Sequence, residues 1–268
     1  MAQPDLTDDY ANFPYIPGSD QFGPRWTQAA RSFRDRMGAQ GRARLDIAYD
    51  SAARTRLDLF LPEARPEGLV VFVHGGFWRS FDKSAWSHFA AGALGRGWAV
   101  AMPSYTLCPE IAISGITAQI RRAVETAAAL VDGPIRLAGH SAGGHLVARM
   151  CCPDVALEEA VAARIVRVMP ISPLSDLRPL VHTEMNADFR LDEASAWAES
   201  PLACTAPRDV PVTVWVGGDE RPAFIDQARW LADAWPRADL VVEPGRHHFD
   251  VIEALAEPGS PMIAALMA

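Results

Sequence analysis

Residues 137–146 decide the fold, and their sequence is Leu-Ala-Gly-His-Ser-Ala-Gly-Gly-His-Leu. The preceding residues 134–138 alternate as a buried strand does, and residues 145–150 continue with a helical pattern. Between them, Ser141 stands on a sharp turn flanked by Gly139 and Gly143, which tolerate strained dihedral angles and let strand and helix pass closely. A serine hydroxyl is a weak nucleophile, so it must be lifted clear of the sheet towards a base. The stretch therefore predicts a strand, nucleophile and helix in that order.

A serine nucleophile needs an acid and a histidine, and both are expected further along the chain. An apolar run at 211–216 leads into Gly-Gly-Asp-Glu, which places Asp219 at the carboxyl end of a strand, with Glu220 as the rival acid. A last strand at 238–243 is followed by His247 and His248, either of which could take the proton from Ser141. Taken singly, such residues are more often helix caps or surface groups. Three of them in the required order, each at a strand end, indicate a catalytic triad.

A fourth element precedes the nucleophile. Residues 68–73 predict a buried strand that runs into His-Gly-Gly-Phe-Trp at 74–78. Acyl transfer creates an oxyanion that needs backbone N–H donors, each worth about 3 kcal/mol. We expect these donors from Gly75, Gly76 and Phe77, with the N–H of Ala142 completing the hole. His74 is expected to brace this loop.

Four motifs together resemble a known family. They are His-Gly-Gly-Phe-Trp at 74–78, Gly-His-Ser-Ala-Gly-Gly-His-Leu at 139–146, Ser-Pro-Leu-Ser-Asp-Leu-Arg-Pro-Leu at 172–180 and His-His-Phe-Asp-Val-Ile-Glu at 247–253. The chain resembles the serine-dependent kynurenine formamidases (arylformamidases) and their bacterial α/β-hydrolase relatives, from about residue 40 to the end. In that family the catalytic histidine precedes Phe-Asp or Phe-Glu, which implies His248, and the strand-end acid implies Asp219.

The resemblance implies hydrolysis of N-formyl-L-kynurenine to kynurenine and formate, a step of tryptophan catabolism, through a formyl-enzyme on Ser141. Hormone-sensitive-lipase-like esterases are also similar, but they carry a third glycine where Phe77 stands and Asp where His140 stands. A carboxylesterase of short-chain esters remains the alternative, since fold and triad do not choose between amide and ester. A ligand-binding homologue without catalysis is a further alternative, although such a protein would not need all three triad residues.

An aryl substrate would need flat apolar walls. Candidates near the predicted site are Phe77, Trp78, Trp86 and Tyr105, and the substrate-binding set we expect is Trp78, Tyr105 and His74. An amino-acid substrate also needs partners for its ammonium and carboxylate groups. The candidates for that role are Arg79, Arg178, Glu184 and Arg190.

Composition predicts a single α/β domain over residues 1–268, because 268 residues with 49% hydrophobic content can bury a large core. A net charge of −8 argues against nucleic acid as a partner, and no apolar run is long enough to span a membrane. The acidic start of the chain lacks the features of a secretory signal, which favours a cytoplasmic location. We expect a small-molecule substrate, no cofactor and no metal, because no zinc-ligand spacing surrounds the histidines. Reduced thiols are expected for the four cysteines, and a homodimer is the assembly we expect.

The remaining pattern is that of an α/β-hydrolase fold, an eight-stranded mostly parallel sheet with helices on both faces and a small helical lid. The opening pair of strands is expected to be antiparallel, and residues 172–203 form a lid-like insertion. Residues 1–42 carry several aromatic side chains and an Arg-rich helix at about 25–37, so we expect them to pack on the core. Strands are expected at about 43–49, 55–62, 68–73, 98–102, 134–138, 165–171, 211–216 and 238–243. Helices are expected at about 83–95, 112–131, 142–152, 192–199, 221–235 and 250–267.

Overall fold

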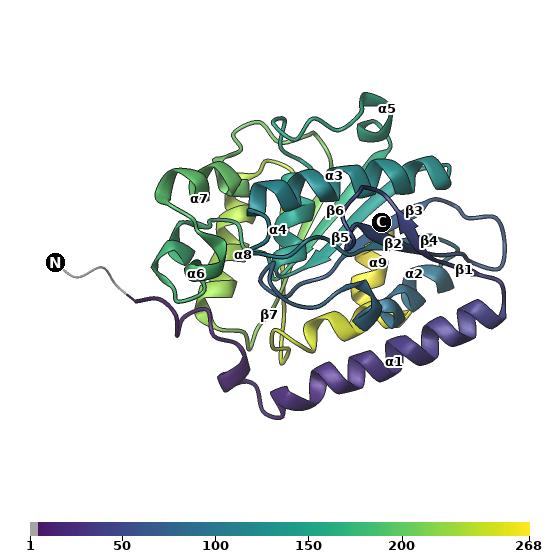
Figure 1. Cartoon of the computed structure of the whole chain (residues 1–268), viewed down its shortest axis with the longest axis horizontal. Helices are drawn as coiled ribbons and strands as arrows, with labels where there is room; N and C mark the ends of the chain where they lie inside the picture. Colours follow the sequence, from purple (N-terminus) through teal and green to yellow (C-terminus); the bar gives the residue numbers. More distant parts are fainter. Residues whose placement is uncertain (1–4) are drawn as a thin grey trace.

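The sheet at the centre of the molecule has eight strands (Figure 1). The structure is a computed structural model that describes residues 5–268. The strands are β1 (Ala43–Ala48), β2 (Arg56–Phe60), β3 (Leu69–Val73), β4 (Ala99–Pro103), β5 (Ile135–His140), β6 (Ile165–Ile171), β7 (Val212–Gly217) and β8 (Ala238–Glu243). Their bounds agree with the predicted strands to within a few residues, and the predicted fold class is confirmed.

The strands lie in the order β1-β2-β4-β3-β5-β6-β7-β8. β1 pairs with β2 and β2 with β4 in antiparallel directions, while all pairs from β4 to β8 are parallel. Because β3, β5, β7 and β8 run in one direction, the loops after all four strands meet at one edge of the sheet. That edge is where open parallel sheets build their sites.

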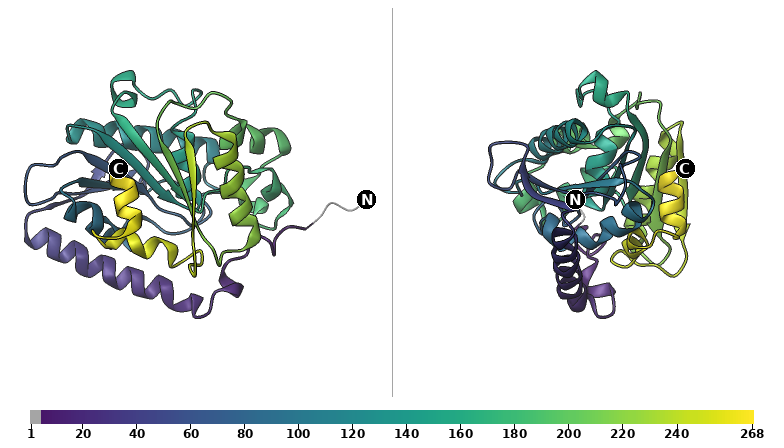
Figure 2. Two further views of the ribbon diagram at one scale, coloured as in Figure 1. Left: turned by 180° about the vertical axis from the view of Figure 1, so that it is seen from behind. Right: turned by 90° about the vertical axis from the view of Figure 1, so that its right-hand side faces the viewer.

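Alternation along the strands creates a core on each face of the sheet. Leu69, Val71 and Val73 of β3 pack into one hydrophobic cluster, whereas Val70 and Phe72 pack into the other. The first cluster is covered by α3 (Ile113–Leu130), α4 (Ala142–Arg149) and α8 (Pro222–Ala234). The second is covered by α1 (Ser19–Ala39), α2 (Ala91–Gly95), α9 (Pro261–Met267) and the 3-10 segments η3 (Ser87–Ala90) and η6 (Val251–Ala256). Figure 2 shows α1 running along this second side beside the C-terminal elements.

Two predicted helices are each divided in the structure. The one expected at 83–95 comprises η2 (Lys83–Ala85), η3 and α2, and Trp86, with φ −117°, separates η2 from η3. The one expected at 250–267 comprises η6 and α9, because Pro258, Gly259 and Pro261 interrupt the helical run. Hydrophobic periodicity located both segments and overestimated their continuity.

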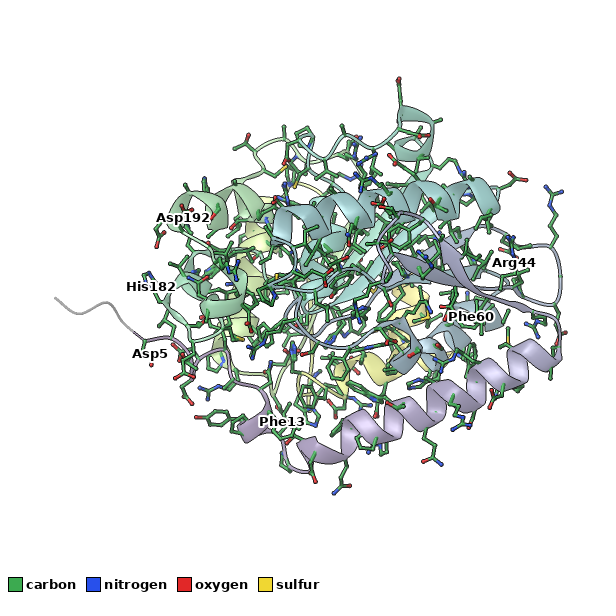
Figure 3. The ribbon with its side chains drawn as sticks, in the orientation of Figure 1. Asp5, Phe13, Arg44, Phe60, His182 and Asp192 are labelled. Atoms are coloured by element: carbon green, nitrogen blue, oxygen red, sulfur yellow. The ribbon has the colours of Figure 1, made fainter. Side chains whose placement is uncertain are left out.

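The N-terminal segment and the insertion lie next to each other at the site edge of the sheet. The insertion holds η4 (Arg178–His182), α6 (Asn186–Phe189), α7 (Glu193–Glu199) and η5 (Pro201–Ala203), while α5 (Glu159–Ala162) lies apart from it at the top of Figure 1. Leu6 N–H donates to the carbonyl of His182 at 2.9 Å. Figure 3 labels Asp5 and His182 on this same side, with Phe13 of η1 (Phe13–Tyr15) further along the segment.

Candidate active site

Ser141 sits in a strained turn between β5 and α4. Its dihedral angles are φ 56° and ψ −117°, a conformation that L residues rarely adopt. The turn closes only because its neighbours lack side chains. A Cβ at Gly139 would lie 2.2 Å from the Gly143 carbonyl oxygen, and one at Gly143 would lie 2.0 Å from that of Val73. The strand, turn and helix that the sequence predicted are therefore present, with Ser141 facing a cavity.

His248 and Glu220 form a buried pair beside Ser141. His248 Nδ1 lies 2.6 Å from Glu220 Oε2, and both side chains are almost fully buried. The other carboxylate oxygen of Glu220 accepts from Gly217 N–H at 2.8 Å and from the Ser172 hydroxyl. With Nδ1–H donating to the carboxylate, Nε2 of His248 is left to accept a proton. This is the tautomer that a general base requires.

The prediction that Asp219 is the acid of the triad is wrong, because the carboxylate that contacts His248 belongs to Glu220. Asp219 is exposed, and its backbone N–H donates to the Arg246 carbonyl oxygen, so its side chain projects from the turn into solvent. Glu220 is the next residue, and its longer side chain turns back under the strand end to reach His248. The physical reason is that the turn after β7 places alternate residues on opposite sides. No sequence pattern signalled this choice, because the contact between the Ser172 hydroxyl and Glu220 joins residues 48 positions apart and appears only in the fold.

His247, the rival base, lies outside the cavity that contains Ser141. Its ring nitrogen Nδ1 accepts from the N–H groups of Phe249 and Asp250 at 3.2 Å, and its ring packs edge-on against Phe22. His248 instead borders the cavity with Ser141. His140, whose pKa burial lowers well below the ordinary value, contacts the His248 carbonyl through Nε2 at 2.8 Å. It holds the His248 backbone in place.

The loop after β3 presents backbone amides next to Ser141. Gly76, Phe77 and Trp78 all have positive φ (112°, 49° and 54°), a run that turns successive N–H groups towards one side. Among residues 5–268, no acceptor meets the N–H of Gly75, Gly76 or Phe77. The N–H of Ala142 begins α4, where first-turn amides have no partner within the helix. A Cβ at Gly75 would lie 3.1 Å from Ser141 Cβ, so the loop packs directly on Ser141.

The three residues expected to bind substrate are structural instead. The rings of His74 and Tyr105 stack at 4.5 Å, and the Tyr105 hydroxyl donates to the His74 carbonyl at 3.1 Å. Burial lowers the pKa of His74 to about 4. Trp78 is fully buried against His145 and Phe189. None of the three borders the cavity, because the positive-φ turn directs Trp78 into the core below it.

The cavity above Ser141 measures about 760 Å³. Most of its walls are apolar and aromatic, and the N-terminal segment supplies the largest part of them. Among the predicted aromatic walls, Phe77 and Trp86 do border it. The aromatic lining residues are Tyr10, Phe13, Phe22, Trp26, Phe77, Phe81, Trp86 and Phe249. No sequence pattern predicted that Tyr10, Asn12, Phe22 and Trp26 of the N-terminal segment would line this cavity.

Charged side chains from the lid, from α1 and from the loop after β3 also border the same cavity. Arg79 pairs with Asp188 of α6 at 2.8 Å, and Glu184 and Asp20 also border the space. Of the four residues suggested for an amino-acid substrate, Arg79 and Glu184 are therefore in place. Arg178 instead pairs with Asp176 and lies over the Trp197 ring, and Arg190 does not border the cavity.

Histidines, cysteines and acidic residues elsewhere do not form a metal site in the part of the chain that the structure describes. Within residues 5–268, no group of His, Cys, Asp and Glu is arranged to hold a metal ion. The four cysteines are free thiols, and burial raises the pKa of Cys151 to about 12. No helix among the described residues is long and apolar enough to cross a membrane.

Comparison with known proteins agrees with this fold. The BD-FAE family model matches residues 57–204, more than half of the chain. A kynurenine formamidase from Danio rerio is 27% identical over 243 residues, which cover 85% of this chain and 82% of that protein. The predicted resemblance to kynurenine formamidases is confirmed at this level of identity.

Two solved structures resemble the whole molecule. A candidate thioesterase from Silicibacter sp. is 58% identical with a TM-score of 0.96, covering 99% of this chain and 100% of that one. Esterase B from Lactobacillus rhamnosis has a TM-score of 0.68 at 16% identity, covering 94% of this chain and 96% of that one. The second likeness concerns the fold alone.

Proposed function

This chain belongs to the BD-FAE family, and we propose that it is a serine hydrolase that removes a small acyl group from an aryl formamide or ester. The substrate we propose is N-formyl-L-kynurenine, which yields kynurenine and formate. The observation that carries the proposal is that Ser141 and His248 border one cavity, with His248 paired to the buried carboxylate of Glu220 behind it. The formamidase relative supports the coarser statement that the chain hydrolyses esters or formamides.

In the mechanism that we propose, Ser141 Oγ attacks the formyl carbon while His248 Nε2 takes the hydroxyl proton. The carbonyl π electrons move to oxygen, and the N–H groups of Gly76, Phe77 and Ala142 stabilise that oxyanion. Collapse of the intermediate breaks the C–N bond, and His248 returns the proton to the departing arylamine. Glu220 stabilises the imidazolium between these steps.

A second half-reaction releases the acyl group. Water loses a proton to His248 and attacks the formyl-enzyme, and the tetrahedral intermediate expels Ser141 Oγ, which regains a proton from His248. Formate leaves as the second product. The buried network of Ser172, Gly217 and Glu220 keeps His248 in one orientation through both half-reactions.

The cavity walls support an aryl leaving group. Phe22, Trp26 and Phe249 contact one another edge-on and form one apolar wall. Phe77, Phe81 and Trp86 line the cavity from the loop that follows β3. A flat ring fits between such walls, and its polar substituents would lie towards the charged groups at the lid.

Those charged groups suit an amino-acid leaving group. The Arg79 guanidinium, which pairs with Asp188 at 2.8 Å, is the donor that would meet a carboxylate, and Glu184 is an acceptor that would meet an ammonium group. An aryl compound with an amino-acid substituent carries the carboxylate and the ammonium group on the same substituent. This arrangement favours the kynurenine-like substrate over a plain aryl ester.

A carboxylesterase or thioesterase of small acyl groups is the second candidate. It is favoured by the 58% identity to the candidate thioesterase and by the esterase-like fold. Purified protein should be assayed side by side on N-formyl-L-kynurenine and p-nitrophenyl acetate. A kcat/KM at least about a hundredfold higher on the formamide, or about 2.7 kcal/mol of transition-state preference, is expected. A higher value on the ester would instead support the carboxylesterase.

A further inference from the structure

Phe81 is a large apolar side chain that stays half exposed at the rim of the active-site cavity. It is 46% exposed and borders the space that contains Ser141 and His248. Its ring contacts two other parts of the wall. A Cβ at Gly76 would lie only 2.8 Å from Phe81 Cδ2, and the Trp86 ring meets the Phe81 ring edge-on at 5.8 Å. Because both neighbours border the cavity, the Phe81 ring lies on its wall with a face or edge open to a ligand.

The backbone at Phe81 is strained. Its φ of 69° lies in the left-handed region, which bulky side chains seldom adopt and glycine adopts freely. The strain lowers stability, and a half-exposed ring recovers only part of the burial energy that a core phenylalanine contributes. Packing alone therefore does not explain why phenylalanine occupies this position. Residues held in such conformations cluster at active sites and ligand contacts.

The surrounding structure holds Phe81 in this conformation. Arg54 donates through Nη2 to the Phe81 carbonyl oxygen and through Nε to that of Tyr105 at 2.9 Å. The next residue, Asp82, caps η2 by accepting from Ser84 N–H at 2.7 Å. The ring is thus in place before a ligand arrives, so little ordering entropy is lost on binding.

The size of the cavity indicates what the ring contacts. At about 760 Å³, the cavity lies within the range of roughly 300–1,000 Å³ that encloses drug-sized ligands. A small acyl group at Ser141 and one aryl ring do not fill such a space. Since the proposed acyl group is small, the leaving group occupies the remainder of the cavity, which includes the rim at Phe81.

We propose that the Phe81 ring binds the apolar part of a leaving group that extends beyond the ring at the scissile bond. Aromatic rings gain from offset or edge-to-face contact with one another, so a fused second ring is the simplest group that Phe81 would select. This role rests on the proposed hydrolase function and adds a specificity-determining residue to it. A purely structural role is the alternative, and it would affect all substrates alike.

The test compares two pairs of substrates that differ only in the extent of the leaving group. The formamide pair is N-(2-naphthyl)formamide and formanilide, and the ester pair is 2-naphthyl acetate and phenyl acetate. Phe81→Gly should lower kcat/KM about tenfold more on the naphthyl member of a pair than on the phenyl member. Phe81→Leu keeps an apolar side chain without the ring, and it should lower the naphthyl-to-phenyl ratio at least about threefold.

Two variants serve as controls. Phe81→Tyr keeps the ring and should hold the naphthyl-to-phenyl ratio within about twofold of the wild-type ratio. Trp230→Ala removes an aromatic side chain of α8 that is 41% exposed and does not border the cavity, so it should leave kcat/KM unchanged on both members of each pair.

Equal losses on both members of a pair, or no loss on either, would show that Phe81 does not select the leaving group. If the enzyme turns over only esters, the formamide proposed as its substrate is wrong, while the ratio within the ester pair still tests Phe81. The dissociation constants of 2-naphthol and phenol, measured by NMR titration, make the same comparison without turnover. Phe81→Gly should weaken the binding of 2-naphthol alone, and equal weakening of both would contradict the proposed role.

Discussion

Asp219 and Glu220 are adjacent in the chain but lie in different environments. The carboxylate of Glu220 is buried on His248 and Ser172, whereas Asp219 faces solvent. Glu220→Gln keeps the size of the side chain but removes the charge that stabilises the imidazolium. It should lower kcat on p-nitrophenyl acetate roughly a thousandfold or more.

Asp219→Asn is the matched control and should change kcat by less than about twofold, as surface substitutions usually do. A larger loss of kcat in Asp219→Asn than in Glu220→Gln would show that Asp219 is the acid. Folded state is checked by circular dichroism of both proteins.

At the residue scale, spacing and motif predicted the nucleophile, and the resemblance favoured His248 over His247. The acid was predicted one residue too early, at Asp219 with Glu220 as the rival, because a one-residue shift within the turn after β7 decides which side chain faces inward. Trp78, Tyr105 and His74 were mispredicted for a related reason. Their backbone course depends on three successive positive φ angles, which no hydrophobic pattern signals.

At the scale of elements, the turn around Ser141 depends on close backbone contact between β3, β5 and α4. A Cβ at Gly143 would lie 2.0 Å from the Val73 carbonyl oxygen, so Gly143→Ala should destabilise the protein by about 3 kcal/mol or more. The free energy of unfolding in urea measures the change.

Gly38→Ala makes the same substitution near the end of α1, where a Cβ would meet no atom within 4 Å. Alanine favours helix over glycine, so this variant should be more stable by about 0.5–1 kcal/mol. Destabilisation by Gly38→Ala, or tolerance of Gly143→Ala, would contradict the packing described for these elements.

Element positions were predictable where burial and periodicity agreed. All eight strands were located, since apolar runs bounded by turn residues mark buried parallel strands. The course of the N-terminal segment was not predictable, because its contacts with Phe224, Gln227 and Arg221 join residues more than two hundred positions apart. The residues that line the cavity could therefore be identified only from the structure.

At the scale of the whole molecule, buried histidines should make the fold sensitive to acid. Burial lowers the pKa of His74 to about 4 and that of His145 to about 3, and lowers that of His140 well below its ordinary value. Each is neutral in the folded state and takes up a proton on unfolding once the pH falls below about 6.5. Their contribution to stability is therefore complete above that pH and is lost as the pH falls towards the folded pKa values.

The expected result is a steep loss of stability on acidification. Burial also lowers the pKa of His88 to about 4, and four such groups give a slope approaching roughly 5 kcal/mol per pH unit below about pH 6. Urea unfolding at several pH values from 7.5 to 5 measures this slope. A stability that is level across this range would show that these histidines are protonated in the folded protein.

The assembly and location of the molecule stay predictions, namely a homodimer in the cytoplasm.

The proposed function depends above all on Ser141 being a nucleophile that His248 and Glu220 activate. The most direct test is intact-mass analysis after incubation with a fluorophosphonate, followed by peptide mapping. We predict one stable adduct on Ser141 in the wild type, none in Ser141→Ala, and loss of esterase and formamidase activity in that variant. An unlabelled wild type, or an adduct that persists in Ser141→Ala, would show that Ser141 is not the activated nucleophile.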